Sequence, residues 1–139
     1  MGPGKAVKCI ADAGALIALM NAADEHHEWA IRTLPQLPRP WLTCEAVLAE
    51  VAALTGQPVA LAREVKAGEL VVPFVLQEQI DSVTSLLERY ADQRMDLADA
   101  CIVRLSELYR GHTVITVDRK DFKVYRRNGR EVIPIIAPE

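Results

Sequence analysis

The sequence has no apolar run long enough to cross a membrane. Its longest apolar stretch, from Cys9 to Met20, is interrupted by Asp12 and Gly14 and falls short of the roughly 18 residues that a membrane span needs. The first residues also do not have the layout of a signal peptide. We therefore expect a soluble, cytoplasmic protein with no membrane partner.

Paired cysteines are missing as well. The three cysteines, Cys9, Cys44 and Cys101, are odd in number, far apart in the sequence, and form no Cys-x-x-Cys pair. This pattern argues against a disulfide framework and against a zinc site built on thiolates. It predicts reduced thiols in or near the core.

An overall excess of positive charge is also absent, although the basic residues are concentrated in one segment. The formal net charge of −3 argues against a uniformly basic nucleic-acid binder. Between residues 119 and 130, however, Asp121 is the only acid, and Phe122 and Tyr125 lie among the cations. The segment is either a solvated turn or a phosphate-binding surface. The candidate RNA-binding residues are Arg119, Lys120, Lys123, Arg126 and Arg127.

No internal repeat, low-complexity tract or long linker divides the chain. A chain of 139 residues, half of them hydrophobic, can bury roughly two thirds of its unfolded surface in one core. We therefore expect a single domain over residues 1–139.

Hydrophobic periodicity and turn residues predict strands that alternate with helices. Residues 1–4 are expected to be loose. The predicted strands are 6–11, 40–42, 70–74, 113–117 and 132–136, and the predicted helices are 15–22, 24–34, 44–54, 58–67, 77–90 and 97–109. Such alternation is typical of an α/β fold with a mostly parallel central sheet of four or five strands and helices on both faces.

Two acids follow predicted strands, where parallel sheets place their functional groups. Asp12 follows the first strand and Asp118 follows the fourth. Ligands bind at the carboxyl ends of strands in open α/β sheets. Taken alone, Asp12 is also a good cap for the helix after it.

Two further acids interrupt the apolar run 95–103. At about 100° per residue, Asp96 and Asp99 lie one helical turn apart and can reach one point. Asp96 can cap the helix, and Asp99 in the first turn is favoured by the helix dipole. Asp99 also borders the apolar face, where a carboxylate is costly unless paired or metal-bound. The segment alone leaves capping and a metal or catalytic site open.

Glu50 is the acid whose position is hardest to explain by solvation. Thr43 is expected to cap its helix, and Val47 and Leu54 lie one turn before and after Glu50, so that Glu50 shares their apolar face. An acid there needs a partner. The neighbouring histidines His26 and His27, by contrast, point about 100° apart and are expected to be solvated or capping rather than ligands of one ion.

If the predicted sheet brings Asp12, Glu50, Asp96, Asp99 and Asp118 together, their repulsion and desolvation call for cations. Ligands that are all oxygen favour Mg²⁺ or Mn²⁺ over zinc. Such ions serve phosphodiester hydrolysis well, because they activate a water and stabilise the leaving oxygen.

Four segments, in order and spacing, resemble the acidic blocks of PIN-domain ribonucleases, and in particular VapC-type toxins of bacterial toxin–antitoxin pairs. These are Asp12 to Leu19, Thr43 to Glu50, Asp96 to Ala100, and Thr116 to Asp118 with Phe122. The resemblance covers nearly the whole chain. Ala13 and Ala15 depart from it, since many relatives carry a hydroxyl residue near the first acid.

The resemblance implies an endoribonuclease that needs Mg²⁺ or Mn²⁺, forms a homodimer and is held inactive by a cognate antitoxin. It implies catalytic roles for Asp12, Glu50, Asp99 and Asp118. Asp12, Asp99 and Asp118 would bind the metal, and Asp96 would be an auxiliary acid that reaches the ions through water.

Two other functions are compatible with parts of the sequence. A phospho-receiver domain resembles this chain in fold class, but it would carry adjacent acids after the first strand, whereas Asp12 is followed by Ala13. Its phosphoacceptor Asp after the third strand is also missing, since that strand leads into Val75 and Leu76. The stronger alternative is a PIN-like module that binds RNA or protein with little catalytic activity.

Overall fold

β1 (Lys8–Ala11) lies in the middle of a five-stranded parallel sheet of order β3-β2-β1-β4-β7. The computed structural model describes residues 7–139, so the predicted loose segment 1–4 and residue 6 lie outside the described residues. The other strands are β2 (Trp41–Leu42), β3 (Leu70–Val71), β4 (His112–Ile115) and β7 (Ile135–Ile136). The predicted mostly parallel α/β fold is confirmed.

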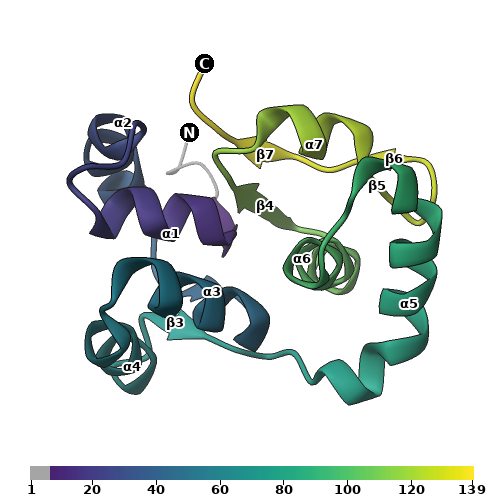
Figure 1. Ribbon diagram of the computed structural model, residues 1–139, viewed down its shortest axis with the longest axis horizontal. Coiled ribbons are helices and arrows are strands. Elements are labelled where there is room, and N and C mark those ends of the chain that lie inside the picture. Colours follow the sequence, from purple (N-terminus) through teal and green to yellow (C-terminus); the bar gives the residue numbers. More distant parts are fainter. Residues whose placement is uncertain (1–6) are drawn as a thin grey trace, which may run out of the picture.

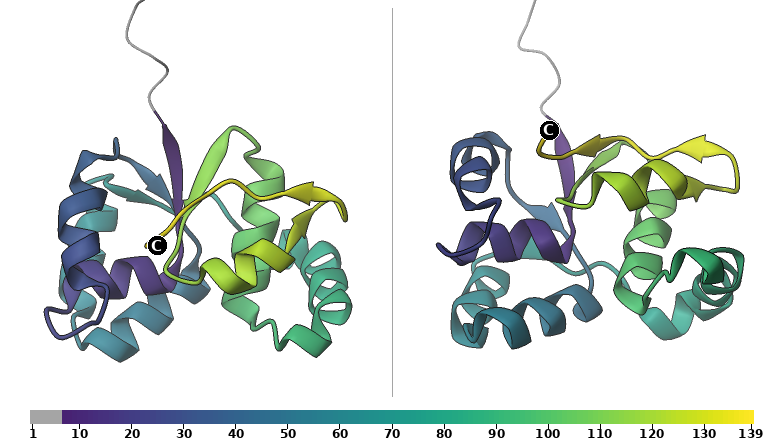
Figure 2. Two further views of the ribbon diagram at one scale, coloured as in Figure 1. Left: turned by 90° about the horizontal axis from the view of Figure 1, so that it is seen from above. Right: turned by 45° about the horizontal axis from the view of Figure 1, so that its top comes forward.

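The helices form two groups on either side of β1 (Figures 1 and 2). One group contains α1 (Ala13–Met20), α2 (His27–Thr33), α3 (Glu45–Thr55) and α4 (Pro58–Lys66). The other contains α5 (Ile80–Arg89), α6 (Leu97–Leu108) and α7 (Arg119–Val124). Short 3-10 turns lie at η1 (Leu34–Gln36), η2 (Leu76–Gln79) and η3 (Ala91–Gln93).

α6 is the most deeply buried of these helices. Its inward side chains include Ile102, Val103 and Leu105, none of which is exposed to solvent. All three cysteines are buried and unpaired, as predicted. In residues 7–139, no helix combines the length and the apolar character needed to cross a membrane.

The segment after β4 differs most from the prediction. The basic stretch is not simply a turn, because it folds into α7 and β5 (Arg126–Arg127), and β5 pairs antiparallel with β6 (Glu131–Val132). Residues 128–130 connect the two strands, and Asn128 and Gly129 in this turn both have positive φ, which asparagine and glycine adopt more readily than other residues. Pro134 divides the predicted strand 132–136 into β6 and β7, while its carbonyl still accepts from the Val114 N–H.

Two predicted helix caps are also wrong. α3 begins after Cys44, and Thr43 instead donates its hydroxyl to the Ala11 carbonyl at 2.9 Å, because a fully buried hydroxyl needs a partner. Asp24 accepts from the His26 N–H in a turn, so α2 starts later than predicted.

Leu54, which was predicted to lie on an apolar helix face, and Ile80, in the predicted helix 77–90, are both exposed. Leu54 is 64% exposed because it lies near the end of α3, beyond the buried Val47 and Val51. Ile80 is 45% exposed because the predicted helix 77–90 is divided into η2 and α5, and Ile80 is the first residue of α5.

Gly14 is required by close packing near the end of the central strand. It lies in the first turn of α1, where an added Cβ would come within 2.4 Å of Val117 Cγ2. Valine is stiff at χ1 and cannot easily move aside. The glycine therefore lets α1 approach the loop after β4, which carries Asp118.

Candidate active site

The strand order places Asp12 and Asp118 near each other. The chain passes from β1 to β2 on one side of the sheet and later returns to β4 on the other side of β1. The carboxyl ends of β1 and β4 therefore form a topological switch point, where open α/β sheets bind ligands. Asp12 directly follows β1, and Asp118 follows β4 by three residues.

Asp12 is held from two directions. Its Oδ1 accepts from the Ala13 N–H at 2.9 Å, so it is the N-cap of α1, as the capping interpretation predicted. Its Oδ2 accepts from the hydroxyl of Thr116 at 2.8 Å. The Thr116 hydroxyl oxygen accepts in turn from the Asp118 N–H at 2.9 Å. Only 6% of Asp12 is exposed, so these bonds fix its carboxylate.

Asp96 and Asp99 form a capping box at the start of α6. The Asp99 N–H donates to Asp96 Oδ1 at 2.8 Å, and the Asp96 N–H donates to Asp99 Oδ2 at 3.5 Å. The capping interpretation is thus confirmed for both residues. It does not account for one further contact, in which the Tyr125 hydroxyl donates to Asp99 Oδ2 at 3.2 Å.

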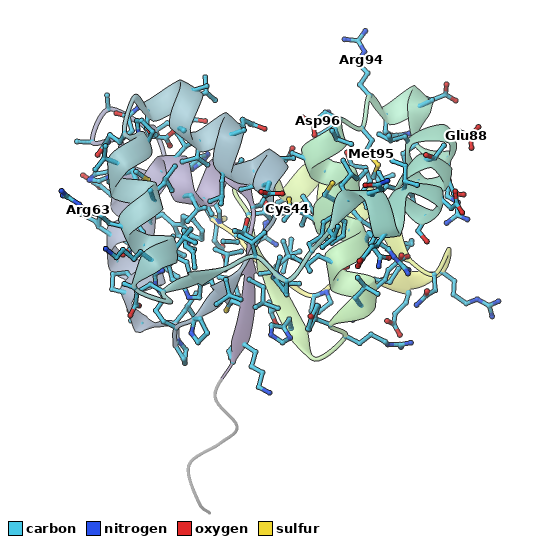
Figure 3. The ribbon with its side chains drawn as sticks, turned by 90° about the horizontal axis from the view of Figure 1, so that it is seen from below. Cys44, Arg63, Glu88, Arg94, Met95 and Asp96 are labelled. Atoms are coloured by element: carbon cyan, nitrogen blue, oxygen red, sulfur yellow. The ribbon has the colours of Figure 1, made fainter. Side chains whose placement is uncertain are left out.

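Glu50 and Asp118 complete the set of predicted acids. Glu50 lies half-buried on α3, and within residues 7–139 it has no ion-pair partner. Asp118 caps α7, where its Oδ1 accepts from the Asp121 N–H at 3.2 Å. In Figure 3, Cys44, the residue before α3, lies in the middle of the molecule, and Asp96 lies at the start of α6.

The acids raise one another's pKa values. Burial raises the pKa of Asp12 from 3.8 to about 6; the bonds from Thr116 and Ala13 oppose the rise, and the charges of Glu50 and Asp118 add to it. Burial, with the charges of Asp96 and Asp12, raises the pKa of Asp99 to about 7. The pKa of Glu50 is also raised, by burial and by Asp96. These acids therefore share one region of negative potential.

Tyr125 differs from the acids because it stays protonated. Burial raises the pKa of its phenol far above the ordinary value, and the charges of Asp99 and Asp121 add to the rise. Its hydroxyl can therefore act as a donor to Asp99 over the whole physiological pH range.

The carboxylates of these acids are suitable ligands for a divalent cation, but they are not spaced as a complete set of ligands for one ion. Carboxylates that repel one another in a desolvated region suit Mg²⁺ or Mn²⁺. In the described part of the chain, however, no three His, Cys, Asp or Glu side chains are close enough to hold one ion. Asp12, Asp96, Asp99 and Asp118 each point toward a backbone N–H that they cap. The region is thus an acidic edge rather than a closed ligand shell.

The basic residues have different surroundings. Arg127, one of the predicted RNA-binding residues, is 6% exposed, pairs with Glu131 at 2.9 Å and donates to two carbonyls, so its guanidinium is already engaged within the fold. Arg119 is half-buried and donates to the carbonyls of Ala137 and Pro138. Arg126 is half-buried and donates to the carbonyl of Tyr125. Lys120 and Lys123 on α7 are exposed.

Two residues of this region were not identified from the sequence. Thr116 carried a usable signal, since it is a hydroxyl residue two positions before Asp118 at the end of a strand. Tyr125 carried none, because its contact with Asp99 joins residues from separate elements.

No family model matches the chain. A comparison with curated proteins found the ribonuclease VapC26 of Mycobacterium tuberculosis, which is 29% identical over 126 residues, covering 86% of this chain and 93% of VapC26. A comparison with solved structures found the crystal structure of VapC20 from the same organism, a toxin that cleaves the sarcin–ricin loop. It superposes with a TM-score of 0.70 at 19% identity, covering 81% of this chain and 92% of VapC20.

The chain has the fold of a VapC-type toxin. The superposition on VapC20 establishes this fold. The sequence similarity to VapC26, which covers most of both chains, agrees with it. The resemblance to VapC-type PIN-domain proteins predicted from the four acidic segments is confirmed.

Proposed function

We propose that the chain is a metal-dependent endoribonuclease and the toxin of a toxin–antitoxin pair. The observation that carries this proposal is the acidic edge at the ends of β1 and β4, where Thr116 joins buried Asp12 to the backbone of Asp118. Burial raises the pKa of Asp12, and burial together with the charges of Asp96 and Asp12 raises that of half-buried Asp99. The similarity to the ribonuclease VapC26 supports RNA as the substrate.

The proposal gives each acid a role. Asp12, Asp99 and Asp118 are the proposed ligands of Mg²⁺ or Mn²⁺, and Asp96 would reach the cation through water. Since no three described side chains form a group that could hold one ion, an ion would be bound directly by one or two of these carboxylates and take its other ligands from water and RNA phosphates. When bound, the cation supplies a nucleophilic water at neutral pH and charge stabilisation for the leaving oxygen. Glu50, whose pKa is raised, can exchange a proton with the attacking water at its carboxyl oxygens.

Other residues orient these acids and the substrate. Thr116 holds Oδ2 of Asp12 and the backbone of Asp118 in one geometry. Lys120 and Lys123 are exposed on α7, the helix that Asp118 caps, so their charges can attract RNA phosphates toward that helix. Homodimer assembly and restraint by a cognate antitoxin, as in VapC-type pairs, are further parts of this proposal.

The test is cleavage of structured RNA by the purified chain with Mg²⁺, with Mn²⁺ and with a chelator. We expect cleavage that needs the cation and is abolished in Asp12→Asn. Asp81→Asn, which removes an exposed acid from α5, is the matched control and should cleave normally. Undiminished cleavage by Asp12→Asn, or in chelator, would contradict the proposal. RNA binding without cleavage would favour the binding-module alternative.

A further inference from the structure

Tyr125 is a fully buried residue whose hydroxyl reaches the candidate active site. Its ring packs edge-on against Tyr90 and Phe122, with centroids 5.1 and 5.2 Å away. Its hydroxyl donates to Oδ2 of Asp99 at 3.2 Å. Because aromatic packing fixes the ring and a buried hydroxyl needs a partner, the phenol oxygen has little freedom to leave this carboxylate.

This contact makes the two oxygens of Asp99 unequal. Oδ2 accepts from the Tyr125 hydroxyl and, at 3.5 Å, from the Asp96 N–H. Within residues 7–139, Oδ1 receives no hydrogen bond. Within the capping box, the carboxylate of Asp99 is held only by the 3.5 Å bond from the Asp96 N–H. The Tyr125 hydroxyl, at 3.2 Å, is therefore the closer of the two donors to this carboxylate.

We propose that Tyr125 is a positioning residue, which holds Oδ2 of Asp99 and so leaves Oδ1 free to bind the divalent cation. This inference rests on the proposed function. Hydrogen bonds to a ligating carboxylate orient it, and loss of such a partner typically costs about 10- to 100-fold in metal affinity or activity.

Tyr90 provides a matched control within the same aromatic cluster. It is also buried, and its hydroxyl accepts from the Arg126 N–H at 2.9 Å. In the described part of the chain it contacts no carboxylate. Tyr125→Phe and Tyr90→Phe therefore each remove one buried hydroxyl, but only the first removes a bond to an acid.

The first experiment is calorimetric titration of Mn²⁺ into the full chain without RNA. Wild type and Tyr90→Phe should bind with similar affinity, and Tyr125→Phe should bind about 10- to 100-fold more weakly. In RNA cleavage, Tyr125→Phe should need more Mn²⁺ for half-maximal rate and should recover most of the rate at saturating Mn²⁺. Because a cation that binds only the folded chain also stabilises it, thermal melts of both variants without metal separate a defect in folding from a loss of metal affinity.

A second measurement needs no variant at position 125. The chain contains three tyrosines, Tyr90, Tyr109 and Tyr125, which ring labelling resolves by NMR. Addition of Mg²⁺ to wild type should shift the Tyr125 ring signal with the same midpoint as metal binding. Tyr109, which packs on His112 at the opposite end of β4, should not move.

The possible failures are distinguishable. Unchanged Mn²⁺ affinity in folded Tyr125→Phe, or an equal loss in Tyr90→Phe, would overturn the role of Tyr125 and leave the proposed function standing. A Tyr125 ring signal that does not shift at saturating Mg²⁺ would also overturn the positioning role of Tyr125. A wild-type chain that neither binds Mn²⁺ nor cleaves RNA would refute the proposed function, and the role of Tyr125 with it.

Discussion

Thr116 and Asp12 are 104 positions apart in the sequence, yet the hydroxyl of one donates to the carboxylate of the other at 2.8 Å. Thr116 is fully buried and also accepts from the Asp118 N–H. One hydroxyl thus joins the ends of β1 and β4 and sets the relative positions of two candidate metal ligands. Its bond also lowers the pKa of Asp12, against the larger effect of burial.

Thr116→Val should damage the site more than the fold. Valine has the shape of threonine but cannot hold Asp12 or satisfy the Asp118 N–H, so we expect Mn²⁺ affinity and cleavage to fall by about 10- to 100-fold. Two hydrogen bonds are lost, and each group left unpaired should cost about 1 to 3 kcal/mol of stability. Thr116→Ser, which keeps the hydroxyl, should stay near wild type in a parallel calorimetric and melting series. An equal loss in Thr116→Ser would show that the hydroxyl alone does not explain the effect.

Sequence patterns predicted the parts of the fold that local chemistry decides. The alternation of apolar strands and amphipathic helices was sufficient for the parallel sheet, because each pattern determines which face of its own element is buried. Pro73 and Pro134 lie next to β3 and β7, the two edge strands of the sheet, where a residue without an N–H for the ladder is tolerated. Asp96 and Asp99 were recognisable as a cap because the motif lies within one helical turn.

Features that depend on long-range contacts could not be predicted. Thr43 looks like a helix cap in sequence, but the nearby Ala11 carbonyl takes its hydroxyl. Arg127 looks like a surface cation, but Glu131 and two carbonyls surround it. The acids were expected to converge, and burial together with neighbouring acids raises the pKa values of Asp12 and Asp99, but no three acids of the described residues form a group that could hold one ion.

The stability of the metal-free chain should depend on pH. The folded-state pKa values of Asp12 and Asp99, about 6 and about 7, lie above the ordinary value of 3.8. The folded chain therefore binds these protons more tightly than the unfolded chain. The binding of these protons adds to the free energy of unfolding. This contribution is fully present below about pH 4 and is lost as the pH rises through about 6 to 7.

Asp99→Asn should remove part of this dependence, because the variant carries no charge at that position. We expect it to be at least as stable as wild type at about pH 8 and to show a flatter profile in thermal melts between about pH 4 and 8. Its Mn²⁺ affinity should fall at the same time. A large loss of metal-free stability would mean that Asp99 serves mainly as a helix cap, and equal Mn²⁺ affinity would remove it from the metal site.

The basic segment should contribute to RNA binding through Lys120 and Lys123. Replacing both exposed lysines by glutamine should make the slope of log affinity against log salt concentration less negative by roughly one to two. Fewer cations are then released from the RNA on binding. The control is Arg63→Gln with Lys66→Gln. It removes the same charge from α4, where Arg63 lies at the left margin of Figure 3, away from Asp96 at the start of α6. An unchanged slope for the lysine variant would show that α7 is only a solvated surface.

Glu50 is the acid for which a structural and a catalytic role predict opposite results. A buried ion pair would lose about 3 to 5 kcal/mol when one partner is removed, but no cation pairs with Glu50 within residues 7–139. Instead, burial and Asp96 raise its pKa, so its charge is a cost to the metal-free fold.

Glu50→Gln should therefore keep or slightly raise the metal-free melting temperature while RNA cleavage falls steeply. Both quantities should be measured on one preparation, with Glu45→Gln, an exposed acid in the first turn of the same helix, as the control for general charge. A marked drop in melting temperature would indicate a structural role after all. Full cleavage by Glu50→Gln would remove Glu50 from the site and leave Glu45 or Asp96 as the missing acid, because the proton transfer proposed for Glu50 requires an ionisable carboxyl.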